Sequence, residues 1–175
     1  MDLIYELIFT VFPYLCLATF VVGHSYRYIT DRYAWNAHSS QILDKKSLRW
    51  GALLFHAGII MTFVGHAGGL LIPQEYYDLF GITSEMHLAI AHWMGEVVGI
   101  AAFVGCLLLL WRRITNHRVR AAGTINDLIT LGGLTLVVGL GVYNVFFGNQ
   151  NVLNSVARWI RGIVFFSPEP DLMRP

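Results

Sequence analysis

The chain has 175 residues, of which 55% are hydrophobic and 13% charged, with a mean hydropathy of +0.55 and a formal net charge of +1. This composition excludes an ordinary soluble domain, and the balanced charge gives no support to a nucleic-acid-binding protein. We expect an all-α membrane protein, a transmembrane helical bundle folded as one domain (1–175), because lipid leaves backbone polar groups to be satisfied inside helices.

Four long apolar stretches are each close to the ~20 residues that cross a bilayer core as a helix. The predicted spans I to IV cover residues 3–27, 49–72, 87–112 and 125–147, and a short amphipathic surface helix covers about 151–166. The first six residues are acidic and lack the positive region of a signal peptide, so span I is expected to be retained.

The connections predict the orientation of the spans. Residues 27–50 and 112–123 are rich in Arg and Lys, which places both segments in the cytoplasm by the positive-inside rule. Residues 73–86 carry Glu and Asp without Lys or Arg, so this segment and the N-terminus are expected on the outer side. Cys16 and Cys106 sit inside apolar spans, where we expect small buried hydrophobic residues rather than reactive thiols.

Span II contains two histidines, His56 and His66. A helix rises about 1.5 Å per residue, so they lie ~15 Å apart along the axis and about 80° apart around it. They cannot share one metal ion, and neutral imidazole is a good axial ligand of haem iron. We therefore expect two haems at two depths, with His56 and His66 as iron ligands. The alternative for each is a core histidine bonded to a neighbouring carbonyl.

Three glycines recur every seven residues along span II and share one side of the helix, namely Gly51, Gly58 and Gly65. Side chains are absent from that stripe, so a flat macrocycle can pack there, and Gly58 and Gly65 are expected cofactor contacts. A neighbouring helix that approaches closely explains the same pattern.

Span III carries ionisable residues near its outer end. His92 and Glu96 are spaced i,i+4 and can interact, and Glu96 lies close to the middle of the bilayer, where an ionisable side chain predicts a function. We expect His87, His92 and Glu96 to relay protons released by a substrate at this end. A neutral Glu96 that is hydrogen-bonded to a helix neighbour is the alternative.

Span IV begins with a Thr124-x-x-Asp127 pattern that predicts a capped helix start. Beyond it, apolar residues recur at helical spacing from Val152 to Val164, with Arg158 and Arg161 on the other side. We expect this amphipathic helix to lie on the outer membrane surface, followed by a loop over residues 167–175.

Several motifs in register resemble the gamma, cytochrome b, subunit of respiratory nitrate reductase. They are the runs at residues 39–46, 54–59, 63–66, 107–113 and 118–121. The resemblance implies five helices that hold two b-type haems, each ligated by one histidine of helix II and one of helix V. It also implies oxidation of quinol near the outer face and transfer of electrons to an iron-sulfur beta subunit, which feeds a molybdenum-containing alpha subunit in the cytoplasm.

The sequence ends where the fifth helix of that family begins, so we expect a truncated chain whose second haem ligands come from outside it. Within the chain, His92 is a substitute partner for His66, and His24 for His56, from their depths. The family has a basic residue near the start of helix III at its quinol site. Met86 occupies that place here, with His87 beside it.

Arginines at the cytoplasmic ends of spans I and III, Arg27, Arg112 and Arg113, can neutralise haem propionates or anchor the helices. Arg112 is the preferred propionate partner, with Tyr28 and Ser39 as weaker candidates. The polar segment 34–46 is the expected docking surface for the iron-sulfur subunit.

The sequence is also compatible with two other functional interpretations. One is the cytochrome b anchor of a sulfite or heterodisulfide reductase complex, whose helix II is similar. The other is a haem-free membrane anchor in which His56, His66 and Glu96 line a proton path.

Overall fold

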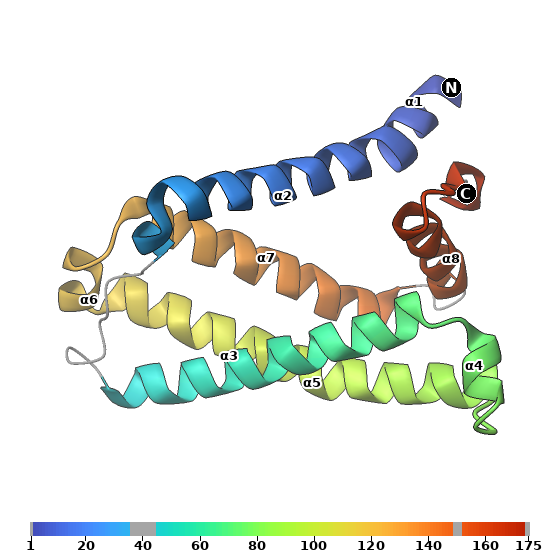
Figure 1. Cartoon of the computed structure of the whole chain (residues 1–175). Helices are drawn as coiled ribbons and strands as arrows, with labels where there is room; N and C mark the ends of the chain where they lie inside the picture. Colours follow the sequence, from blue (N-terminus) through green and yellow to red (C-terminus); the bar gives the residue numbers. More distant parts are fainter. Residues whose placement is uncertain (1, 36–44, 149–151, 174–175) are drawn as a thin grey trace. The chain divides into compact units, whose positions relative to one another are not determined.

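The computed structural model of the chain describes residues 2–35, 45–148 and 152–173, and these residues form helices and turns without a strand (Figure 1). Four helical stretches are long and apolar enough to cross a membrane. They are Leu3–Asp31, Ser47–Leu71, Ser84–Thr115 and Ile125–Phe147. Most of their large apolar side chains are exposed within the chain, as expected where lipid or partner subunits cover the surface. The predicted all-α bundle with four spans is confirmed.

The described residues divide into two compact units. The first consists of the N-terminal helix and the C-terminal segment. The N-terminal helix is built from α1 (Asp2–Glu6), the π-helical turn η1 (Leu7–Val11) and α2 (Phe12–Asp31), with the 3-10 turn η2 (Arg32–Trp35) after it. The C-terminal segment contains α8 (Val152–Val164) and the 3-10 turn η4 (Pro170–Met173).

Two long-range hydrogen bonds hold α8 against the N-terminal helix. The indole Nε1–H of Trp159 donates to the carbonyl of Phe9 at 2.8 Å, and the Tyr14 hydroxyl donates to the carbonyl of Ile163 at 3.1 Å. Trp159 also packs edge-on against the Phe9 ring. The predicted amphipathic helix is therefore present and packs through its apolar face, while its place on the membrane surface stays a prediction.

The second unit consists of α3 (Lys45–His66), the π-helical turn η3 (Ala67–Leu71), α4 (Gln74–Asp78), α5 (Ser84–Thr115), α6 (His117–Ala121) and α7 (Ile125–Phe147). Helix α5 lies beside α3 and beside α7 (Figure 1). This unit contains both histidines of span II and the ionisable residues of span III.

The crossing of α3 and α5 depends on glycines. A Cβ atom on Gly58 would lie 2.6 Å from the backbone nitrogen of Ala102, and one on Gly105 would overlap the backbone of Phe55. Only hydrogen fits at either position, so the two backbones approach as closely as glycine permits. Ala102 and Cys106 are buried at this crossing.

The connection between α5 and α7 is closed by a charged contact. Arg113 donates to the Asp127 carboxylate at 2.7 Å, and the same carboxylate accepts from the Thr124 backbone N–H at 2.9 Å. The Thr124 hydroxyl accepts from the Asp127 N–H in return, which completes the predicted capping box.

The structure corrects several sequence-based boundaries and one burial prediction. Span IV has the predicted limits, whereas α5 extends three residues beyond span III at each end, from the start capped by Thr83 to Thr115. Cys106 is buried as predicted, but Cys16 is exposed, because no residue of α2 is buried within the chain. The expected C-terminal loop contains the turn η4.

Candidate functional site

His56 and His66 are oriented in the same way on α3. The Nδ1 atom of His56 lies 2.7 Å from the Ala52 carbonyl oxygen, and that of His66 lies 2.8 Å from the Thr62 carbonyl oxygen. A carbonyl oxygen only accepts, so each Nδ1 carries the proton and each Nε2 keeps its lone pair. Neither Nε2 has a hydrogen-bond partner among the described residues, and both side chains are exposed.

This arrangement fits an axial ligand of haem iron. Ligating histidines usually donate the second ring N–H to a carbonyl or carboxylate, which sets the tautomer and the ring orientation. The carbonyl bond expected for a core histidine is thus present, but it occupies Nδ1 and leaves Nε2 available. Within the described ranges no three His, Cys, Asp or Glu residues group around a common point, and haem iron needs only axial ligands from the protein.

The three glycines of α3 have different surroundings. Added Cβ atoms on Gly51 and Gly58 would meet α5, with Leu109 at 3.0 Å from the first and Ala102 at 2.6 Å from the second. A Cβ atom on Gly65 would have no atom of the described residues within 4 Å, apart from its chain neighbours and the backbone of its own helix. Helix packing therefore accounts for Gly51 and Gly58, and Gly65 alone leaves an open surface next to His66. A cofactor contact at Gly58 or Gly65 stays a prediction.

The helix changes its geometry directly after His66. Residues Ala67–Leu71 form the π-helical turn η3, which contains Gly68 and Gly69. Such turns widen a helix locally and are frequent at functional sites. The sequence signal was the glycine pair, but it does not distinguish a π turn from an ordinary helix end.

His92 and Glu96 form the predicted i,i+4 pair on α5. The Nε2 atom of His92 lies 3.2 Å from Oε1 of Glu96, and the two side chains are 33% and 24% exposed. Both groups thus remain accessible from outside the chain, so the pair can exchange a proton with a bound molecule. The interaction is confirmed, and the relay role stays a prediction.

His87 belongs to a separate polar cluster at the start of α5. Its Nδ1 atom lies 3.0 Å from Oε1 of Gln74 on α4, and its ring lies 4.2 Å, centroid to centroid, from the Tyr77 ring. Gln74 also donates from Nε2 to Oδ1 of Asp78 and to the Ile82 carbonyl, both at 2.9 Å. Sequence reasoning missed Gln74 and Tyr77, because the Gln74–His87 contact joins two helices across a turn and has no local sequence pattern.

The predicted propionate partners occupy different environments. Arg112 is buried, with 5% of its surface exposed, and Arg113 donates a hydrogen bond to the Asp127 carboxylate. Ser39 lies outside the described residues, as does most of the predicted docking segment 34–46. Burial of Arg112 favours a packing role, and its contact with a propionate stays a prediction.

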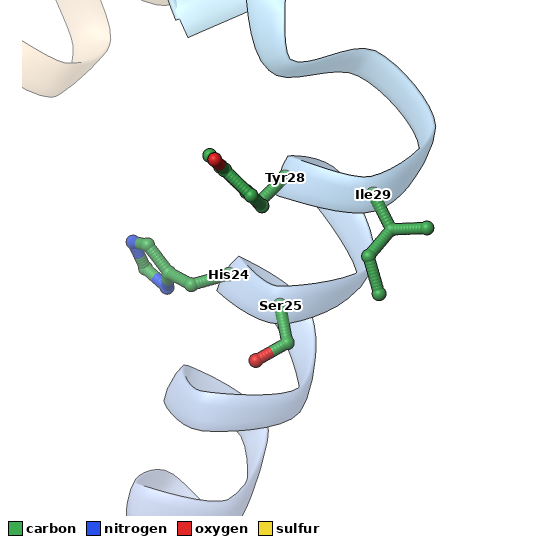
Figure 2. A pocket seen from close by; sticks show the side chains of 4 residues that line it. All are labelled: His24, Ser25, Tyr28 and Ile29. Carbon is green, nitrogen blue, oxygen red and sulfur yellow. The ribbon is translucent and has the colours of Figure 1, made fainter.

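The remaining candidates, His24 and Tyr28, line an open hollow of about 440 Å³ on α2 together with Ser25 and Ile29. Figure 2 shows His24 and Tyr28 pointing to the same side of the helix, while Ile29 points away. His24 places its Nδ1 atom 2.8 Å from the Phe20 carbonyl, the same local geometry as in His56 and His66.

Comparison with known proteins places these features in a family context. Residues 5–175 match the family described as "Nitrate reductase gamma subunit". The chain is 36% identical over 172 residues to the "Nitrate reductase gamma chain" of Bacillus subtilis, which covers 96% of this chain and 77% of that protein. It is 35% identical over 162 residues to the "Respiratory nitrate reductase 2 gamma chain" of Escherichia coli, covering 90% of this chain and 71% of that protein. A third relative is the "Nitrate reductase-like protein NarX" of Mycobacterium tuberculosis, 34% identical over 178 residues, covering 98% of this chain and 27% of that protein.

Proposed function

The chain belongs to the nitrate reductase gamma subunit family, and from that premise we propose that it is a dihaem cytochrome b subunit that oxidises quinol and delivers electrons to nitrate reductase. Family membership supports a cytochrome b subunit of a respiratory nitrate reductase and a multi-pass membrane protein with four apolar helices in this chain. The number of haems and the direction of electron flow are part of the proposal.

The proposal rests on the geometry of His56 and His66. Both side chains project Nε2 lone pairs from one membrane-crossing helix, at heights that differ by ~15 Å. Imidazoles at two heights would suit two haems, one held in the outer and one in the inner half of the bilayer. When bound, a b-type haem supplies an iron centre that takes up and releases one electron at a time.

The protein ligates and orients each haem through a few groups. His56 and His66 are the proposed iron ligands, each held by its Nδ1–H bond to the preceding turn. Gly65 is the proposed contact of the ring, because at Gly58, the other predicted contact, Ala102 of α5 takes up the space. Arg112, Tyr28 and Ser39 are the proposed contacts of the propionates. The second iron ligands are proposed to come from outside these 175 residues. His92 is a poorer substitute for His66, because its Nε2 faces Glu96.

Oxidation of one quinol releases two electrons and two protons. We assign the protons to His87, His92 and Glu96, three ionisable side chains in the half of α5 predicted to face outward. The His92–Glu96 distance of 3.2 Å supports direct proton transfer within the pair. His87, beside Gln74, is the proposed first contact of the quinol hydroxyl.

The remaining assignments follow from charge and family. The N-terminus and residues 73–86 are proposed to face outward from the cytoplasmic membrane, and the basic segments to face the cytoplasm. Electrons then leave on the cytoplasmic side to an iron-sulfur beta subunit and a molybdenum-containing alpha subunit, which reduces nitrate.

The assembled complex tests this function directly. Its absorption spectrum should show b-type bands, and a membrane-soluble quinol added without nitrate should reduce them within the turnover time of the enzyme. Nitrate added afterwards should reoxidise them. A colourless complex, or bands that dithionite reduces but quinol does not, would contradict the proposal.

A further inference from the structure

The orientation of the Gln74 amide is determined by its neighbours. Its Nε2 donates to Oδ1 of Asp78 and to the carbonyl of Ile82, both at 2.9 Å. An amide nitrogen donates but does not accept, and a carboxylate or carbonyl oxygen accepts but does not donate. If the amide nitrogen and oxygen were exchanged, Oε1 of Gln74 would lie against both the Asp78 carboxylate oxygen and the Ile82 carbonyl oxygen, and neither contact has a hydrogen to share. Oε1 must therefore face His87.

The amide in turn selects the tautomer of His87. Because Oε1 of Gln74 only accepts, the Nδ1 atom of His87, 3.0 Å away, must carry the ring proton. In the neutral ring Nε2 then holds a lone pair. Among the described residues no hydrogen bond to that Nε2 is present, and a Cβ atom added to Gly69 of η3 would lie 4.0 Å from it.

An apolar hollow includes Tyr77, the residue whose ring contacts that of His87. It measures about 430 Å³ and is lined by Leu71, Ile72, Pro73, Tyr76, Tyr77 and Phe80. Small-molecule sites are usually lined by apolar and aromatic side chains together with a few placed polar atoms.

We propose that Gln74 is a positioning residue that keeps the lone pair of His87 Nε2 directed at the substrate, and that it thereby makes the site prefer quinol over quinone. This inference rests on the proposed function. A quinol hydroxyl donates a hydrogen bond to a free Nε2, whereas a quinone carbonyl only accepts and would face the lone pair. Without Gln74 the ring can take the other tautomer, whose Nε2–H suits the quinone.

The test uses the complete nitrate reductase complex with menadiol as donor and menadione as product inhibitor. The measured quantity is the inhibition constant of menadione divided by the KM of menadiol. In Gln74→Met, which keeps the length of the side chain without its amide, this ratio should fall by roughly tenfold, since one hydrogen bond is lost for quinol and one is gained for quinone. Asp78→Asn is the matched control and should keep the ratio, because the Asn oxygen still accepts from Gln74.

A double-variant comparison separates positioning from general damage. His87→Gln should lower the ratio as well, and adding Gln74→Met to it should change the ratio no further, since Gln74 acts through His87. If Gln74→Met weakens both ligands equally, if His87→Gln leaves the ratio unchanged, or if the two changes add, the inference is wrong. A wild-type complex that menadiol does not reduce contradicts the proposed function itself, whereas normal reduction with an unchanged ratio in Gln74→Met contradicts only this inference.

Discussion

At the scale of single residues, His24, His56 and His66 share one local geometry. Each places Nδ1 within 2.8 Å of the carbonyl oxygen four residues earlier, which is a distance that any exposed helical histidine can reach. This bond alone does not mark a haem ligand. His56 and His66 differ from His24 because they occupy one helix at two heights, and His66 also adjoins the turn η3 and the open surface at Gly65.

The His92–Glu96 pair supports a prediction about protons. Glu96→Gln keeps the size of the side chain and its hydrogen bond but cannot take up a proton. We expect quinol-dependent haem reduction to slow by about tenfold or more, since a positioned acid–base group typically contributes at least that much. Glu85→Gln, an exposed change in the first turn of the same helix, is the control. Equal rates for both variants over the whole pH range would rule out the relay.

The Arg113–Asp127 contact supports a prediction about stability. Both side chains are partly buried, at 22% and 26% exposure, and the carboxylate also caps α7. Asp127→Ala removes both interactions, and we expect a loss of about 1–3 kcal/mol in the free energy of unfolding. The exposed pair Arg158–Glu169 offers a comparison, where Glu169→Ala should change stability little. Unfolding of the detergent-solubilised complex by dodecyl sulfate measures the stability change in both variants. Equal changes would show that the Arg113–Asp127 contact stabilises the protein no more than the exposed Arg158–Glu169 pair does.

At the scale of elements, local patterns were predictable and contacts between helices were not. The Thr124/Asp127 capping box and the His92–Glu96 pair follow from spacing within one helix, so both were expected and found. Apolar length also predicted the four spans. In contrast, the seven-residue glycine spacing suited a cofactor and a helix equally well. Only the position of α5 shows that Gly58 meets Ala102 while Gly65 meets nothing.

The glycine at the α3–α5 crossing gives a prediction at this scale. Gly58→Ala adds a methyl group where the Ala102 backbone lies 2.6 Å away, so the helices must separate, and we expect a loss of about 1–3 kcal/mol in stability. Gly133→Ala adds the same group to α7 with no atom within 4 Å and should be neutral or stabilising. Similar unfolding curves for the two variants would contradict the close crossing.

A substitution at Gly65 distinguishes a role in helix packing from a role in cofactor binding. Because an added Cβ meets no protein atom within 4 Å, Gly65→Ala should leave protein stability unchanged. If a haem lies against this surface, the same methyl group should lower the haem content or shift the b-type absorption bands. An unaltered spectrum would place the haem elsewhere.

At the scale of the whole molecule, the charges of the connections predict how the chain crosses the membrane. In intact cells a cysteine in place of exposed Glu75 should react with a membrane-impermeant maleimide, whereas a cysteine in place of exposed Arg118 should react only after the cells are opened. Cys16, which is exposed, must first be replaced by Ala. The reverse labelling pattern would show that the chain crosses the membrane in the opposite orientation and would contradict the proposed direction of electron flow.

The ligand assignment of His56 and His66 is the claim on which the other assignments depend. It is tested by the haem-to-protein ratio of the purified complex in His56→Ala, His66→Ala and the double variant, with the exposed His117 of α6, changed to Ala, as control. We expect each single variant to lack one b-type haem with its own absorption band, the double variant to lack both, and the control to keep both. A full haem complement in either single variant would contradict it.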